Sequence, residues 1–187
     1  MKRKIIILSI LAICVATLAG GTLAYFTSES TAHNVVTTGG VEIEVQEWAD
    51  ADRTTPFEDL DGILPDMSVT KIAEVKNTGA SDAWIRVRVT REIRLTREGT
   101  PDASLVELDL NLNDWTQGED GYLYYNQALK PGEVTAPIFT TVTFNKAMGN
   151  EYQNAAATVD VLAQAVQTAN NGTSALDAQG WPAEEQE

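Results

Sequence analysis

The residues of this chain that could carry out chemistry are few, and most of them are carboxylates. The 187-residue sequence holds one histidine, His33, and one cysteine, Cys14. It has no His-Glu-x-x-His motif, which would supply two zinc ligands and the general base of a metallopeptidase. No Gly-x-Ser-x-Gly elbow surrounds any serine, as a serine hydrolase of that type would need. We therefore predict no catalytic residues and no enzymatic activity.

Carboxylates crowd the irregular segment between residues 49 and 66. Oxygen-rich loops bind hard cations such as calcium, although the spacing here is not that of an EF-hand loop. Two interpretations stay open: an acidic solvated loop, or a calcium site. No other cofactor is predicted. The candidate calcium ligands are Asp50, Asp52, Asp59 and Asp61, with Glu58 and Asp66 close by in the sequence.

A group of aromatic residues could line a surface for a carbohydrate or a protein partner. It consists of Trp115, Tyr122, Tyr124, Tyr125 and Trp181. Tyr122 and Tyr124 are two positions apart and would share one face of a strand. We expect that face to pack on the core, with Tyr125 pointing the other way.

The elements that position these residues are predicted to be β-strands, because apolar residues recur mostly at every second position. Turn signals such as Asn77-Thr78-Gly79 and Lys130-Pro131-Gly132-Glu133 separate the alternating runs. This pattern predicts an all-β fold, an antiparallel two-sheet sandwich of the jelly-roll type. The alternating runs lie at 41–45, 85–95, 108–112, 138–144 and 159–163.

One or two short helices are expected beside the strands. The stretch 145–156 is one candidate, and 174–179 is the other, with Thr173 or Asn171 as its N-terminal cap.

The N-terminal residues have the features of a secretory signal. Three basic residues precede a long apolar run, and small residues follow it up to Ala24. Thr22 and Ala24 suit the small positions before a cleavage site, so the mature chain would begin at Tyr25 or Phe26. A retained membrane anchor is the alternative, but glycines interrupt the apolar run before the roughly 20 residues that a membrane span needs. A lipoprotein cysteine at Cys14 is also conceivable, although the bulky Ile13 precedes it.

These features divide the chain into four parts. Residues 1–24 are the predicted signal peptide, 25–38 a segment that could donate a strand, 39–182 the sandwich domain and 183–187 an acidic tail. Membrane contact is expected only through an uncleaved signal.

The charge of the chain argues against nucleic acid as a partner. The formal net charge is −14, and loss of residues 1–24 removes three positive and no negative charges, giving −17. Phosphate backbones need a basic surface. Solubility outside the cell is the plain interpretation, and attraction of divalent cations or of a cationic wall component is the functional one.

The order of these features resembles the TasA/camelysin family of extracellular proteins from Gram-positive bacteria. The resemblance spans most of the chain and is most distinctive near the predicted cleavage site. One departure is Asp66, which stands where the family's first Pro-Gly turn has glycine. The segments that carry the resemblance are 20–27, 31–34, 39–43, 64–71, 75–79, 84–87, 120–125 and 129–133.

This resemblance implies a secreted jelly-roll subunit whose leader is cut by a dedicated signal peptidase. The best-known members of the family polymerise into biofilm-matrix fibres, in which the freed N-terminal segment lies as a strand in the neighbouring subunit. The implied partners are further copies of the chain and other matrix proteins, at the cell surface or in the extracellular matrix. The corresponding candidates for strand donation are Phe26, Ala32, Asn34, Val35 and Val36.

Three alternatives remain open at this point. The segment from Ala32 to Thr38 could be the first strand of its own sheet. The protein could then be a monomeric cell-surface binding protein. Some members of the family carry a metallopeptidase label, so a camelysin-like secreted peptidase is the third possibility.

Overall fold

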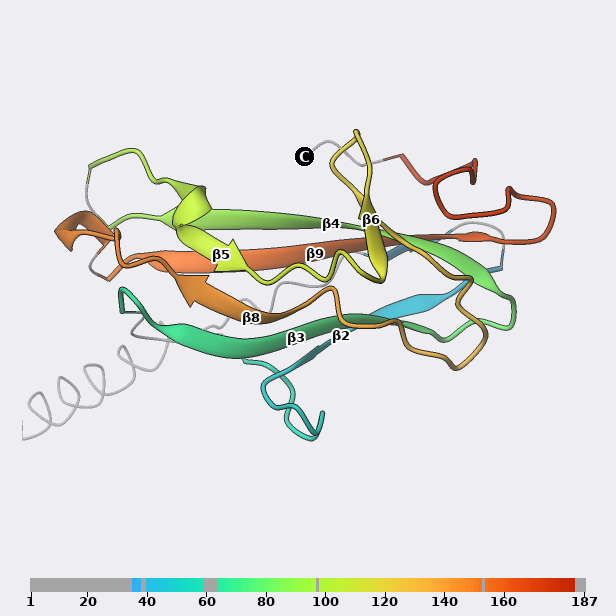
Figure 1. Ribbon diagram of the computed structural model, residues 1–187, viewed down its shortest axis with the longest axis horizontal. Coiled ribbons are helices and arrows are strands. Elements are labelled where there is room, and N and C mark those ends of the chain that lie inside the picture. Colours follow the sequence, from blue (N-terminus) through green and yellow to red (C-terminus); the bar gives the residue numbers. More distant parts are fainter. Residues whose placement is uncertain (1–34, 38–39, 59–63, 97, 153, 184–187) are drawn as a thin grey trace, which may run out of the picture. The chain divides into compact units, whose positions relative to one another are not determined.

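The structure is a computed structural model, and the part of the chain that it describes contains nine strands (Figure 1). The described residues are 35–37, 40–58, 64–96, 98–152 and 154–183, and they belong to one compact unit, Ala32–Glu187. The strands are β1 Val35–Thr37, β2 Ile43–Trp48, β3 Ser68–Asn77, β4 Ala83–Arg94, β5 Val106–Leu108, β6 Trp115–Gln117, β7 Leu123–Tyr125, β8 Phe139–Phe144 and β9 Ala156–Gln167.

Two sheets pack as a sandwich, as the alternating pattern predicts. One sheet has the order β1-β9-β4-β7-β6, and the other has the order β2-β3-β8-β5. Every pairing is antiparallel except that of β1 with β9, which is parallel and departs from the purely antiparallel expectation. The longest pairing joins β4 to β9 over the full length of both strands.

The core lies between the sheets and consists of the inward side chains of the alternating runs. Ile85 and Val87 of β4 are fully buried, as are Phe139 of β8 and Ala163 of β9. Removing such apolar side chains from water stabilises the sandwich by about 25 cal/mol for each Å² buried. These inward side chains hold the two sheets together.

The expected strand at 108–112 is wrong beyond its first residue. β5 ends at Leu108, and the side chains of Leu110 and Leu112 are 37% and 58% exposed. The carboxylate of Asp109 accepts hydrogen bonds from the backbone N–H groups of Thr140 (2.8 Å) and Thr141 (2.7 Å) of β8. The Asp109 side chain thus accepts hydrogen bonds from the β8 backbone just beyond the end of β5, where the backbone of a longer strand would have paired.

The two expected helices are also wrong for the described residues, where the helical elements are single 3-10 turns at Ala103–Leu105 and Asn150–Tyr152. In 145–156, the side chain of Asn145 accepts the N–H of Ala147, and Asn154 adopts a positive φ of 62°. Asparagine side chains thus compete with helical hydrogen bonds. The stretch 174–179 forms turns instead, because Asn171 binds both backbone groups of Gln179.

Asp66 keeps the geometry that a glycine would provide. Its φ is +63°, and the N–H of Met67 bonds the carbonyl of Leu64 (3.2 Å) across the turn. The same turn recurs at Lys130–Glu133 with Gly132 at φ +80°. Aspartate at position 66 therefore preserves the turn that the resemblance implies. It does so at an energetic cost, because a residue other than glycine is unfavourable in the left-handed region.

We expect Asp66→Gly to raise the free energy of unfolding by about 0.5–1 kcal/mol, because glycine adopts this conformation without a Cβ clash. Urea unfolding followed by tryptophan fluorescence measures the change. The matched control is Gly132→Asp, which should lower stability by a similar amount. An Asp66→Gly protein no more stable than the wild type would contradict the argument.

Candidate functional site

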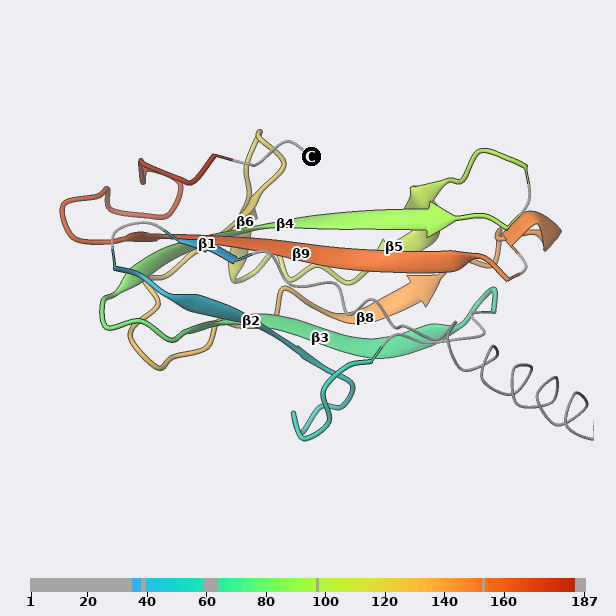
Figure 2. The same cartoon turned by 180° about the vertical axis from the view of Figure 1, so that it is seen from behind.

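The candidate site is the edge of the five-stranded sheet, where β1 meets β9 (Figure 2). Val35, Val36 and Thr37 pair with Ala163, Gln164 and Ala165. Two of the strand-donation candidates, Val35 and Val36, thus lie in a strand that pairs with β9 of its own chain. The other three, Phe26, Ala32 and Asn34, lie outside the described residues, as do the cleavage-site candidates Thr22, Ala24 and Tyr25.

β9 lies between β1 and β4 in the five-stranded sheet. On one side it pairs with β4 at every position from Ala156 to Gln167, and on the other β1 pairs with Ala163–Ala165. Among the described residues β1 is therefore the edge strand of this sheet, and a sheet edge is where a further strand can pair.

An ion pair lies between the two sheets and contacts β9. The ammonium of Lys71 in β3 lies 3.1 Å from a carboxylate oxygen of Glu47 in β2, and these side chains are only 8% and 9% exposed. The same ammonium donates a hydrogen bond to the backbone carbonyl of Val159 in β9 (3.0 Å) and lies 4.7 Å from the ring centroid of Phe57. The group formed by Lys71, Glu47, Phe57 and the Val159 carbonyl is called the Lys71 cluster below.

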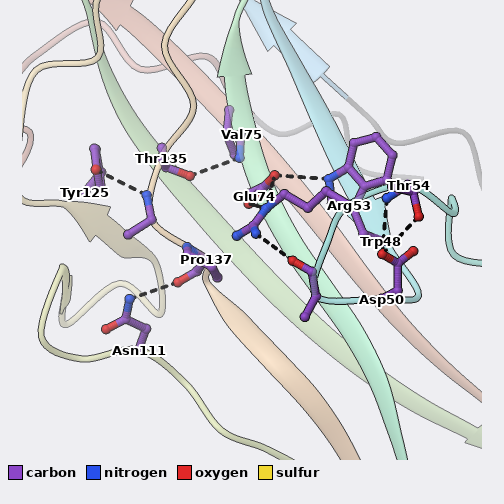
Figure 3. A network of polar contacts seen from close by, with 12 residues as sticks. Trp48, Asp50, Arg53, Thr54, Glu74, Val75, Asn111, Tyr125, Thr135 and Pro137 are labelled. Carbon is purple, nitrogen blue, oxygen red and sulfur yellow. Dashed lines mark hydrogen bonds and ion pairs between the residues drawn. The ribbon is translucent and has the colours of Figure 1, made fainter.

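The acidic segment around Asp50 is an internally bonded loop on the outer side of β2 and β3 (Figure 3). Asp50 accepts hydrogen bonds from the backbone N–H groups of Thr54 (3.2 Å) and Thr55 (2.7 Å). Although desolvation raises the pKa of Asp50, these hydrogen bonds outweigh it and lower the pKa below its usual value. Its carboxylate thus serves the loop itself.

Arg53 fixes this loop to the sheet. Its Nε donates to both carboxylate oxygens of Glu74 (2.9 and 3.0 Å), which also accepts the indole N–H of Trp48 (3.0 Å), as Figure 3 shows. Glu74 is nearly buried, so both partners are needed to satisfy its charge.

The calcium candidates are not brought together within the described part of the chain. Asp50 is bonded as above, Asp52 is exposed, and Asp59 and Asp61 lie outside the described residues. Those residues that are described contain no group of three or more acidic, histidine or cysteine side chains able to hold a metal ion. In the same residues, no helix has the length and hydrophobicity to cross a membrane.

The aromatic residues divide between the two faces of β7, in the opposite sense to the prediction. Tyr125 faces the main core, where its ring lies 5.0 Å from that of Trp115. Tyr122 and Tyr124 share the outer face and pack in a second cluster with Trp84. They are buried there because the C-terminal segment 168–183 covers this part of the sheet, a contact that alternation along β7 cannot reveal.

Arg86 of β4 organises this second cluster. Its guanidinium carbon lies 3.9 Å from the ring centroid of Tyr122 and 4.7 Å from that of Trp181. Its Nε donates to the side-chain oxygen of the fully buried Gln164 (2.8 Å), and Nη1 lies 3.3 Å from Asp120. The stack thus joins β4, β7, β9 and the C-terminal segment.

The hydroxyl of Tyr124 donates to Asp120 at 2.6 Å. Desolvation raises the pKa of Asp120. The hydrogen bonds from Tyr124 and from the N–H of Tyr122, together with the charge of Arg86, outweigh it, so the pKa lies below its usual value. Burial and the bond to Asp120 raise the pKa of Tyr124. This arrangement keeps a carboxylate ionised and a phenol neutral, and it serves packing.

Sequence reasoning missed Arg86 and the residues of the Lys71 cluster. A signal existed for Glu47: it continues the inward series Ile43 and Val45, where an apolar residue is expected. Lys71 likewise lies two positions before the inward Ala73. Charged residues at inward positions of strands point to a polar contact inside the sandwich.

No protein-family model, curated protein or solved structure matches this chain. The arguments that follow rest on the sequence and on the geometry described above.

Proposed function

We propose that this protein is a secreted structural subunit of cell-surface or biofilm-matrix fibres, assembled when the N-terminal segment of one copy adds as a strand to a neighbouring copy. The observation that carries the proposal is β1, where Val35–Thr37 of the N-terminal segment pairs as a strand with Ala163–Ala165 at the edge of the five-stranded sheet. Strand addition at such an edge gains affinity from backbone hydrogen bonds.

The register of β1 supports the same segment as the added strand. Val35 lies opposite Ala163, so a donated strand that kept this parallel register would bring residues 28–34 opposite 156–162. These seven residues include no proline, which would interrupt backbone pairing. The segment thus has the backbone donors that strand addition requires.

The order of the strands supports the finer assignment to the jelly-roll type. β4 lies beside β9, and β3 lies beside β8, so strands early in the chain pair with late ones in both sheets. Nested pairing of this kind belongs to jelly rolls. Two features modify the pattern here: the hairpin of β2 with β3, and the parallel β1.

Exchange of the N-terminal segment between copies would produce filaments. The donated segment and the acceptor edge are different surfaces, so each copy can accept a strand and donate one, and the contact does not close on itself. The predicted signal peptide and the resemblance to the TasA/camelysin family support a secreted location, processing by a signal peptidase, and other matrix proteins as partners.

One observation favours a second candidate, the monomeric cell-surface protein. β1 pairs with β9 of its own chain, so the edge could be filled in part without a second copy. The two candidates differ in what the N-terminal segment does in the mature protein.

Deletion of residues 25–38 from the mature protein tests the proposal. We expect purified wild-type protein to form filaments in electron micrographs, and the deletion variant to remain a folded monomer by circular dichroism and light scattering. Val36→Pro provides a second variant, because proline at this position removes a backbone donor from β1 while the chain keeps its length.

Filaments formed equally well by both variants would exclude strand donation by this segment. A wild-type protein that stays monomeric at every concentration and pH tested would favour the second candidate. Casein cleavage that a chelator abolishes would instead support the peptidase alternative.

A further inference from the structure

We propose that Arg91 and the 3-10 turn Ala103–Leu105 close the β5 edge of the four-stranded sheet to strand pairing between copies of the chain. Among the described residues β5 is one of the two edge strands of that sheet. The inference rests on the proposed function in one respect, because it explains why copies would join through the N-terminal segment and not through β5.

The backbone groups of Val106, the first residue of β5, face away from β8. Val106 lies opposite Phe144 of β8. The N–H of Phe144 donates to the carbonyl of Met67, and its carbonyl accepts the N–H of Asp66, so both groups point toward the residues that lead into β3 (both 2.8 Å). Two opposite residues of an antiparallel pair either bond each other or both face outward. The N–H and the carbonyl of Val106 therefore point to the outer edge of the sheet.

Both of these edge-facing groups are bonded within the chain. The N–H of Val106 donates to the carbonyl of Ala103 in the 3-10 turn. The carbonyl of Val106 accepts a hydrogen bond from Nη1 of Arg91 in β4, a strand of the other sheet (2.9 Å). An arriving strand would have to break both bonds before it paired with Val106. Charged side chains and short strands at an edge are means by which proteins prevent such pairing.

Side chains fix the two ends of β5 as well. Before the strand, the carboxylate of Asp102 accepts the backbone N–H of Ser104 (2.9 Å) and its hydroxyl (2.6 Å), which holds the 3-10 turn. After the strand, the carboxylate of Asp109 binds the N–H groups of Thr140 and Thr141 in β8. The edge strand is thus limited to three residues.

The consequence is that assembly is directed to the other sheet. Outward-facing residues alternate along a strand, so only Val106 and Leu108 of β5 present backbone groups to the edge, and those of Val106 are taken. The affinity of strand addition comes from backbone hydrogen bonds, and a single residue provides too few of them. Association between copies is therefore left to the N-terminal segment.

The test is the double variant Arg91→Met/Asp102→Ala of the mature chain. It removes the donor to the Val106 carbonyl and the side chain that holds the turn. The matched control is Arg94→Met/Glu92→Ala, which removes one positive and one negative charge from exposed positions of β4. Circular dichroism checks that both variants fold, and sedimentation velocity measures their association.

We expect the double variant to self-associate at least tenfold more strongly than the wild type, through paired β5 edges, and the control to match the wild type. The amide of Leu108 reports the contact because it faces the edge. Its hydrogen exchange should slow by roughly tenfold or more when the double variant associates, compared with the dilute monomer of the same variant.

A folded double variant that associates no more than the wild type would overturn the proposal, and so would added association that leaves Leu108 unprotected. Protection of Leu108 in wild-type filaments would also overturn it, because the edge would then be in use. If the double variant does not fold, the single variant Arg91→Met decides by the same two measurements. Absence of filaments from the wild type would count against the proposed function alone, since the comparison of variant with wild type needs no filaments.

Discussion

Asn77→Ala should lower the free energy of unfolding by about 3 kcal/mol, because it removes three hydrogen bonds of a fully buried side chain. Asn77 at the end of β3 is fully buried. Its Nδ2 donates to the carbonyls of Ser81 and Leu129 (both 2.8 Å), and its Oδ1 accepts the N–H of Gly79 (2.9 Å). Alanine removes these three bonds and opens a cavity, although the Leu129 carbonyl keeps the N–H of Ala83 and the Gly79 N–H keeps the carbonyl of Glu42.

The effect should reach beyond the turn itself. The backbone of Asn77 also bonds Gly132 and Glu133, and the carbonyl of Leu129 bonds the N–H of Ala83 at the start of β4. Asn77 therefore joins the end of β3 to two other segments. We expect the loss to appear as a shifted urea midpoint with an unchanged slope, since the same surface is exposed on unfolding.

Asn126→Ala is the matched control for this prediction. Asn126 also makes two side-chain hydrogen bonds, to Thr116 (2.7 Å) and Asn113 (3.2 Å), but it is exposed. Water can replace those bonds, so its loss should lie within about 0.5 kcal/mol. Similar losses for the two variants would contradict the account.

Arg86→Ala should cost about 3 kcal/mol and release the C-terminal segment from the sheet. The substitution removes the layer between Tyr122 and Trp181, and it leaves the buried side-chain oxygen of Gln164 without the Arg86 donor. Gln164 also donates a hydrogen bond to the carbonyl of Pro182 (3.2 Å), so a Gln164 side chain that loses its fixed position would also loosen the segment 168–183. Urea unfolding and limited proteolysis of residues 168–183 measure the two effects.

Two variants show which property of Arg86 matters. Arg86→Lys keeps the charge but loses the planar group that lies against the rings, so we expect most of the loss to remain. Arg94→Ala, at the exposed end of the same strand, should have little effect. Protease resistance of residues 168–183 equal to the wild type in Arg86→Ala would refute the clamping role.

Much of the fold could be predicted from alternation. The runs at 41–45, 85–95, 138–144 and 159–163 all lie in or beside strands, with their apolar members mostly inward. Alternation failed at Leu110 and Leu112, where the carboxylate of Asp109 ends the strand by binding β8. The two helix candidates were wrong because asparagine side chains bind nearby backbone groups there.

The candidate site was less accessible to sequence reasoning. Val35 and Val36 were singled out as strand residues, but their register on β9 depends on residues more than a hundred positions away. The partners of Lys71 could not be predicted for the same reason, because they lie on other strands.

The sequence by itself determined the acidic charge, the positions of most strands and the Lys130–Glu133 turn, because charge, two-residue periodicity and turn chemistry are local properties of the chain. Tertiary structure alone decided which face of β7 meets the core and that Lys71 reaches the carbonyl of Val159. Both faces of β7 carry aromatic residues of similar hydrophobicity, so only the packing of the other sheet and of the C-terminal segment distinguishes them. The Lys71 contact joins residues 88 positions apart, and no local pattern encodes such a distance.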